Sequence, residues 1–171
     1  MKRLLNLLLG VLLLAAAACT SGSASDAWRD NAVIYELNVR QFTPAGTFAA
    51  AEERLPALRD LGVDIVWLMP VHPIGVEGRK GTLGSYYAIR DYRAINPEFG
   101  TMADFERFLD RAHKLGMRVI LDYVANHTSP DHAWVTEMPA EWYVRDSTGV
   151  PVVQYDWTDI AKLNYATPAV R

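Results

Sequence analysis

Two continuous apolar runs, each preceded by a helical pattern, constrain the fold of this chain most strongly. Residues 63–69 contain Ile65-Val66-Trp67-Leu68 without a polar break, and residues 117–124 are almost wholly apolar until Asp122. Such runs suit strands that are buried on both faces, as in a parallel sheet. A shorter β-rich segment covers residues 33–39. The order strand, helix, strand, helix, strand predicts successive βα units and an α/β fold, either a (β/α)8 barrel or a doubly wound sheet.

The two segments between these strands have helical spacing, and both end before a glycine. In residues 47–61, the internal Pro56 predicts a kink or a break into two short helices. Residues 101–115 form a clearer amphipathic pattern. Thr101 can cap this second helix, with Asp104 three residues further on.

The first eighteen residues are a different kind of segment. Two basic residues precede an apolar run that ends in four alanines at 15–18. The run is shorter than the roughly 20 residues that a helix needs to cross a bilayer, so it predicts a secretory signal peptide. Cys19, the only cysteine, follows directly and resembles the lipidated cysteine of a bacterial lipobox, although Ala16 stands where leucine is typical. We expect residues 19–30 to be a lipidated cysteine on a flexible tether; ordinary cleavage nearby is the alternative.

Composition excludes one class of partner. The formal net charge is −3 and the sequence has no basic stripe, so it lacks the clustered positive charge that binds nucleic acid.

Residues 128–171 have no long period and are rich in aromatic residues among Pro, Gly, Asp and Ser. Aromatic rings bind the faces of sugars, but they fill protein cores more often.

Polar side chains converge where the third strand is expected to end. Asp122, Asn126 and His127 lie within six residues. In parallel α/β folds, ligands bind at the carboxyl ends of the strands. The simpler interpretation is a strand that ends in polar residues and begins a turn.

The segment Asp122–His127, with the sequence DYVANH, resembles the first short motif of the alpha-amylase family, glycoside hydrolase family 13. Four other segments resemble that family in the same order: VIYELNVRQF (33–42), LGVDIVWLMP (61–70), YAIRDYRAINPEFGT (87–101) and TDIAKLNYATPAVR (158–171). The resemblance covers residues 32–171. It implies a partial (β/α)8 barrel, with the first three βα units over residues 31–127. Residues 128–171 then resemble the inserted domain B of the family and the return toward strand four.

The resemblance also implies roles for individual residues. Tyr87 matches the tyrosine that stacks under the sugar next to the scissile bond. Asp122 matches an aspartate that supports the active-site network, and His127 matches a histidine that hydrogen-bonds the hydroxyls of that sugar. Asn126 matches a residue that supplies an oxygen to calcium in many members, and an amide oxygen is a suitable ligand. No organic cofactor is expected.

The implied activity is retaining hydrolysis of alpha-glucans or maltooligosaccharides. Retention requires a nucleophile and an acid/base, two carboxylates about 5–5.5 Å apart, which the family carries on strands four and five. We expect both groups after Arg171, the last residue, so that the chain lacks them and is inactive and poorly folded alone; Asp131, Asp156 and Asp159 match neither role. The expected location is outside the cytoplasm, held at a membrane through Cys19. The alternatives are a glucan-binding surface lipoprotein without catalysis and a parallel-sheet enzyme of unrelated chemistry.

Overall fold

The structure is a computed structural model, and it describes residues 27–171. The chain divides into two units, residues 1–32 and residues 33–171. The described part of the first unit contains one short 3-10 helix, η1 (Ala27–Arg29). The predicted signal peptide and Cys19 lie outside the described residues. Among residues 27–171, no helix has the length and apolar character that a membrane span requires.

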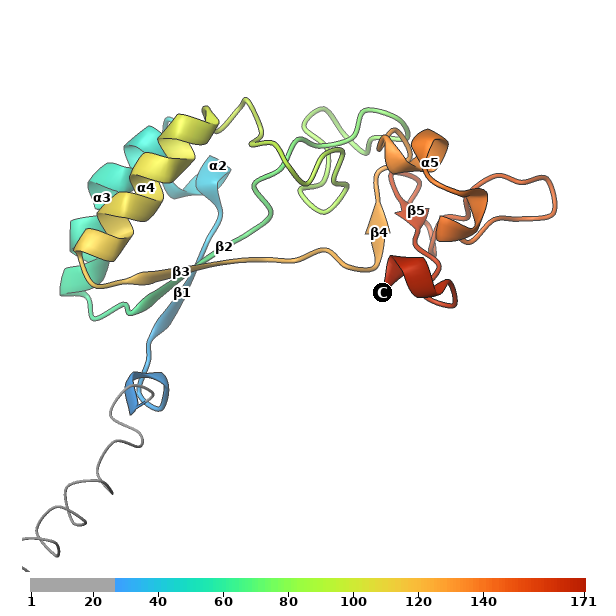
Figure 1. Cartoon of the computed structure of the whole chain (residues 1–171). Coiled ribbons are helices and arrows are strands. Elements are labelled where there is room, and N and C mark those ends of the chain that lie inside the picture. Colours follow the sequence, from blue (N-terminus) through green and yellow to red (C-terminus); the bar gives the residue numbers. More distant parts are fainter. Residues whose placement is uncertain (1–26) are drawn as a thin grey trace, which may run out of the picture. The chain divides into compact units, whose positions relative to one another are not determined.

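The first part of the second unit contains a parallel three-stranded sheet (Figure 1). Its strands are β1 (Ile34–Leu37), β2 (Ile65–Leu68) and β3 (Arg118–Leu121), in the order β1-β2-β3. The register aligns Ile34 with Ile65 and Ile65 with Arg118. The predicted α/β fold with parallel βαβ units is therefore confirmed. The first strand is shorter than predicted, because Val39 begins the short helix α2 (Val39–Phe42).

Two longer helices connect the strands and pack against each other. They are α3 (Phe48–Asp60) and α4 (Met102–Lys114). The main core lies between these helices and the sheet, and its largest aromatic members are Phe48, Phe99 and Phe108. The Phe48 ring contacts the Phe108 ring with centroids 5.5 Å apart. Burial of these apolar faces stabilises both helices more than their intrinsic propensity does.

Helix α3 continues through Pro56 without interruption, so of the two predicted outcomes, a kink or a break into two short helices, the break does not occur. Proline removes one backbone hydrogen bond from a helix. Leu55 and Leu58 on either side of it are buried in the main core, and this packing compensates for the missing bond.

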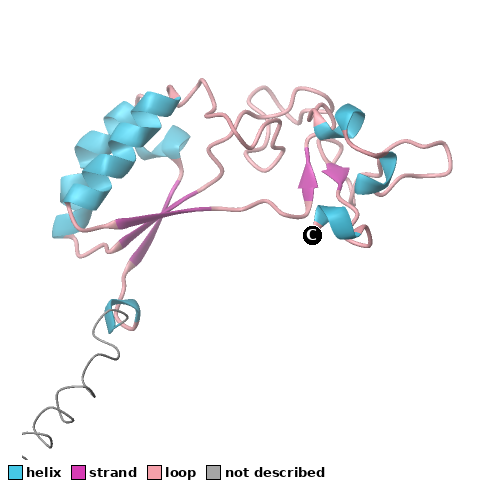
Figure 2. Cartoon of the chain, in the orientation of Figure 1, coloured by secondary structure: helices cyan, strands magenta, loops and turns pink. Residues whose placement is uncertain are grey.

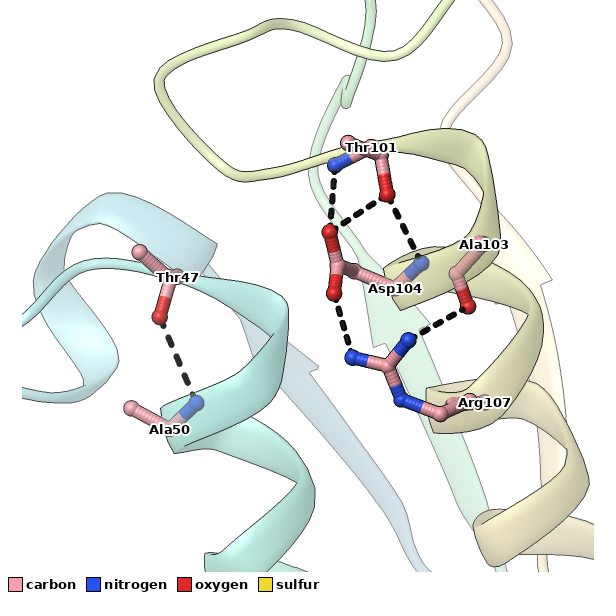
Figure 3. A network of polar contacts seen from close by, with 6 residues as sticks. All are labelled: Thr47, Ala50, Thr101, Ala103, Asp104 and Arg107. Atoms are coloured by element: carbon pink, nitrogen blue, oxygen red, sulfur yellow. Dashed lines mark hydrogen bonds and ion pairs between the residues drawn. The ribbon is translucent and has the colours of Figure 1, made fainter.

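Both helices begin at a threonine cap (Figure 3). Thr47 Oγ1 accepts a hydrogen bond from Ala50 N at 3.3 Å. Thr101 Oγ1 accepts from Asp104 N at 3.2 Å, and the Asp104 carboxylate accepts from Thr101 N at 2.7 Å. The predicted Thr101 cap is thus a complete capping box.

After β3 the chain is mostly loop, with short elements (Figure 2). Strands β4 (His127–Thr128) and β5 (Ala161–Lys162) form an antiparallel pair. Three single-turn helices accompany them: α5 (Trp134–Glu137), η2 (Ala140–Trp142) and η3 (Pro168–Val170). A small separate core of Tyr143, Ala161 and Leu163 holds this region together.

Candidate functional site

The carboxyl ends of β2 and β3 carry the segments that form the candidate site. Asp122 directly follows β3, and its backbone N–H donates to Leu68 O at 2.9 Å, which continues the ladder past β2. The long loop of residues 69–100 leaves β2 at the same edge and carries Tyr87. Parallel topology therefore brings two segments that are distant in sequence to one edge of the sheet.

Tyr87 connects the two ends of the predicted motif. Its phenol O–H donates to Asp122 Oδ2 at 3.0 Å. Its main-chain carbonyl accepts a hydrogen bond from His127 Nε2 at 3.2 Å. Partial burial and the bond to Asp122 raise the pKa of Tyr87 to about 12, so the phenol remains a donor at neutral pH.

The hydrogen bonds of His127 define its tautomer. The Asn126 amide Nδ2 donates to His127 Nδ1 at 3.0 Å, so Nδ1 is the acceptor and Nε2 carries the proton given to Tyr87 O. Burial of the ring lowers the pKa of His127, which keeps the imidazole neutral, although the bond to Tyr87 O opposes this shift. Both ring nitrogens therefore have protein partners, and a sugar hydroxyl that bonds this ring would replace one of them.

Asn126 is positioned by a second contact. Its Nδ2 also donates to Gln154 Oε1 at 2.9 Å, so both amide hydrogens are used and Oδ1 makes no hydrogen bond among the described residues. The same residues contain no group of three or more His, Cys, Asp or Glu side chains that could hold a metal ion. Asn126 Oδ1 is therefore an oxygen available to calcium, with no cluster of charged ligands around it among residues 27–171.

Tyr87 and His127 open into a cavity of about 460 Å³. Asp122 and Asn126 contact these two residues but do not line the cavity. The other lining residues are Lys80, Gly84, Ser85, Trp157, Asp159 and Ile160. None of these six was predicted as a site residue, although Asp159 and Ile160 lie in the segment 158–171 that resembles the family.

Aromatic rings continue outward from the imidazole. The rings of His127 and Trp157 lie 6.0 Å apart, and those of Trp157 and Tyr155 lie 5.2 Å apart. Trp157 is 39% exposed and Tyr155 is 78% exposed. Apolar ring faces beside polar groups are suited to binding a sugar, which has both C–H faces and hydroxyls.

The loop at Gly78 and the loop at Thr158 lie in close contact beside this cavity. Thr158 Oγ1 donates to Gly78 O at 3.1 Å. Gly78 has a φ of +66°, and a Cβ on it would lie 2.1 Å from Thr158 O. Lys80 pairs with Asp156 at 3.6 Å along the same contact. Glycine at 78 is therefore required both by backbone conformation and by space.

The last residue, Arg171, does not line the cavity. It follows η3, and its guanidinium Nε donates to Tyr165 O at 2.8 Å. The Tyr165 phenol in turn donates to Ala125 O, within the motif segment. The end of the chain is thus joined to the motif through Tyr165, and the expectation that the nucleophile and the acid/base follow Arg171 stays a prediction.

A larger cavity of about 620 Å³ contains none of the four predicted site residues. Its lining includes Arg90, Tyr92, His132 and Trp134. Size alone does not identify a functional site. The smaller cavity is the better candidate, because the predicted polar residues converge on it.

Comparisons with known proteins agree on one family. The model of the alpha-amylase catalytic domain matches residues 21–169. The chain is 36% identical over 155 residues to alpha-amylase MalA of Haloarcula japonica, a match that covers 85% of this chain and 22% of that protein.

Solved structures give the same result. An alpha-amylase from Lactobacillus plantarum superposes with a TM-score of 0.79 at 51% identity, covering 82% of this chain and 33% of that one. The noncanonic maltogenic alpha-amylase AmyB from Thermotoga neapolitana gives a TM-score of 0.75 at 42% identity, covering 82% of this chain and 33% of that one. The chain thus spans 22% of the curated relative and 33% of each structure.

Proposed function

This chain belongs to the alpha-amylase family of glycoside hydrolases, and on that premise we propose that it binds the sugar at the scissile bond of an alpha-glucan or maltooligosaccharide. The observation that carries the proposal is the position of Tyr87. One end of this residue contacts Asp122, the other contacts His127, and its ring borders the cavity. We assign substrate stacking to Tyr87, hydroxyl recognition to His127 and support of Tyr87 to Asp122.

We propose that β1, β2 and β3 are the first three strands of a (β/α)8 barrel. Residues 128–171 would then be an inserted domain that borders the active site. The parallel pairing of the three strands and the separate core at Tyr143, Ala161 and Leu163 support this assignment.

The proposed reaction is hydrolysis with retention, which uses a carboxylate nucleophile and a carboxyl acid/base. We assign neither role to Asp131, Asp156 or Asp159. Asp131 accepts from Val76 N at 3.0 Å, and Asp156 pairs with Lys80. Asp159 lines the cavity, but its place in the sequence matches neither carboxylate of the family. We therefore expect the 171-residue chain by itself not to hydrolyse oligosaccharides.

Steady-state kinetics of the protein as its gene encodes it, with maltotriose and maltoheptaose, test this function. Tyr87→Ala and His127→Ala should each lower kcat/KM at least about tenfold, equivalent to about 1.4 kcal/mol. Leu83→Ala is the matched control, because Leu83 lies in the same loop, is 56% exposed and does not line the cavity. Binding without turnover would favour the non-catalytic glucan-binding lipoprotein, and neither binding nor turnover of any alpha-glucan would refute the proposal.

We propose that the protein is exported and held at a membrane by a lipid on Cys19. The sequence pattern of residues 1–19 supports this location. Metabolic labelling with a radioactive fatty acid should mark the wild type and leave Cys19→Ser unmarked. An unlabelled wild type would contradict the anchor.

Calcium at Asn126 is a further part of the proposal. The supporting observation is that Asn126 Oδ1 makes no hydrogen bond among the described residues and is therefore available as a ligand. Removal of calcium with a chelator should lower the melting temperature of the wild type and have no effect on Asn126→Ala. Equal melting temperatures with and without calcium would exclude the site.

A further inference from the structure

Tyr92 contacts the backbone of the motif and does not line the cavity of Tyr87 and His127. Its phenol oxygen lies 2.7 Å from Val124 O and 3.1 Å from His127 O, close enough to donate to either carbonyl. Tyr92 follows Tyr87 by five residues in the same loop. The loop and the motif segment are therefore joined at both Tyr87 and Tyr92.

Three residues of the segment Val124–His127 lie between β3 and β4, and His127 is the first residue of β4. Between β3 and β4 the chain is irregular, so its backbone carbonyls must be satisfied from elsewhere. Leu163 N donates to Asn126 O at 3.1 Å, and the Tyr165 phenol donates to Ala125 O. The single Tyr92 O–H lies within reach of the two remaining carbonyls, those of Val124 and His127, and can donate to either of them.

The ring of Tyr92 is held in place by packing that does not involve its oxygen. It stacks on Trp134 with centroids 5.6 Å apart and an interplanar angle of 28°. It also contacts the His72 ring at 5.7 Å and the His132 ring at 5.6 Å. A phenylalanine would keep this packing and lose only the hydrogen bonds.

We propose that Tyr92 is a positioning residue for His127, whose backbone it fixes against the loop that carries Tyr87. The inference rests on the proposed function, because it concerns the same sugar-binding site. Burial raises the pKa of Tyr92, so the phenol remains a donor at all physiological pH values.

The central test is a double-mutant cycle in the protein as its gene encodes it, with maltotriose as substrate. Tyr92→Phe alone should raise KM roughly fivefold to tenfold, the effect of one lost buried hydrogen bond. In a His127→Ala background the same substitution should change KM less than about twofold, because coupled residues are not additive. An unchanged KM, or an equal effect in both backgrounds, would overturn the inference.

Thr101→Ala controls for general loss of stability. It removes a helix cap at the start of α4, a change that typically costs about 1 kcal/mol. Its melting temperature should fall while its KM stays within about twofold of the wild type. If Thr101→Ala raises KM as much as Tyr92→Phe does, the effect of Tyr92 is only structural and the inference fails.

A spectrum that needs no substrate separates this inference from the proposed function. In protein labelled with 15N at histidine, Tyr92→Phe should shift the ring resonances of His127, which His127→Ala identifies by their absence. Thr101→Ala should leave them in place. If the protein has no activity on glucans but the shift is seen, the proposed function fails and the positioning role stands. If the His127 resonances do not shift, the positioning role is contradicted.

Discussion

At the scale of single residues, Tyr87 has two separable roles. Its ring borders the cavity, while its phenol contacts Asp122 and its carbonyl contacts His127. Tyr87→Phe keeps the ring and the carbonyl and removes only the bond to Asp122. The two roles can therefore be measured apart.

We expect Tyr87→Phe to raise KM for maltotriose roughly threefold to tenfold, much less than Tyr87→Ala. This range is low for a hydrogen bond to a carboxylate, because both side chains are partly exposed to water. Asp122→Asn should have a similar effect, and combining it with Tyr87→Phe should add little. Strictly additive effects in KM measurements would show that the two residues act independently.

Gly78 is the second residue with a specific requirement. We expect Gly78→Ala to destabilise the protein by more than Gly81→Ala, which is the matched control. Both glycines have a φ of +66°, but a Cβ on Gly81 meets nothing within 4 Å, whereas one on Gly78 meets Thr158 O at 2.1 Å. Left-handed strain alone costs about 1–2 kcal/mol. Urea unfolding of the two variants measures the difference, and equal losses would mean that the loops separate freely.

At the scale of elements, the two helix caps differ in charge. The cap of α3 is a neutral threonine, while that of α4 includes the Asp104 carboxylate (Figure 3). Asp104 also pairs with Arg107. Two neighbours lower the pKa of Asp104 from 3.8 to about 2. The hydrogen bonds from Thr101 are the largest cause, and the hydrogen bond and positive charge of Arg107 add to it.

This pKa predicts how the stability of α4 depends on pH. A lowered folded-state pKa means that the contribution of Asp104 is present above its unfolded pKa near 4 and is lost as the pH falls toward 2. Asp104→Asn should therefore be less stable than the wild type at pH 6 and nearly equal to it at pH 2. Thr47→Ala should show a constant difference from the wild type in the same urea titrations. A pH-independent difference for Asp104→Asn would contradict the role of the charge.

At the scale of the whole chain, the sheet has two open edges among the described residues. β1 and β3 are the outer strands. Ile34 is 54% exposed, Ile120 44% and Leu121 44%. Exposed apolar edge strands favour pairing with another copy.

We expect the 171-residue chain to self-associate at micromolar concentration. Ile120→Lys should shift it toward monomer in analytical ultracentrifugation, since a charge on an edge opposes strand pairing. Leu61→Lys is the control, because Leu61 is 73% exposed at the end of α3, away from the strands. A monomeric wild type, or equal effects of both lysines, would show that the edges do not drive association.

Local and periodic features could be predicted from the amino-acid sequence. The apolar runs at residues 63–69 and 117–124 placed two strands, helical spacing placed α3 and α4, and Thr101 with Asp104 marked the start of α4. These features depend on neighbours within a few residues, and so they can be read along the chain. The motif at Asp122, Asn126 and His127 was visible for the same reason.

Features that depend on contacts between distant residues could not be predicted from the sequence and follow from the fold. Packing of Leu55 and Leu58 kept α3 continuous through Pro56. Three sets of contacts each cross 30 or more residues: Tyr87 with Asp122 and His127, Trp157 with His127, and Gly78 with Thr158. No periodic signal along the chain encodes such pairs, because they form only when the parallel strands bring their carboxyl ends to one edge.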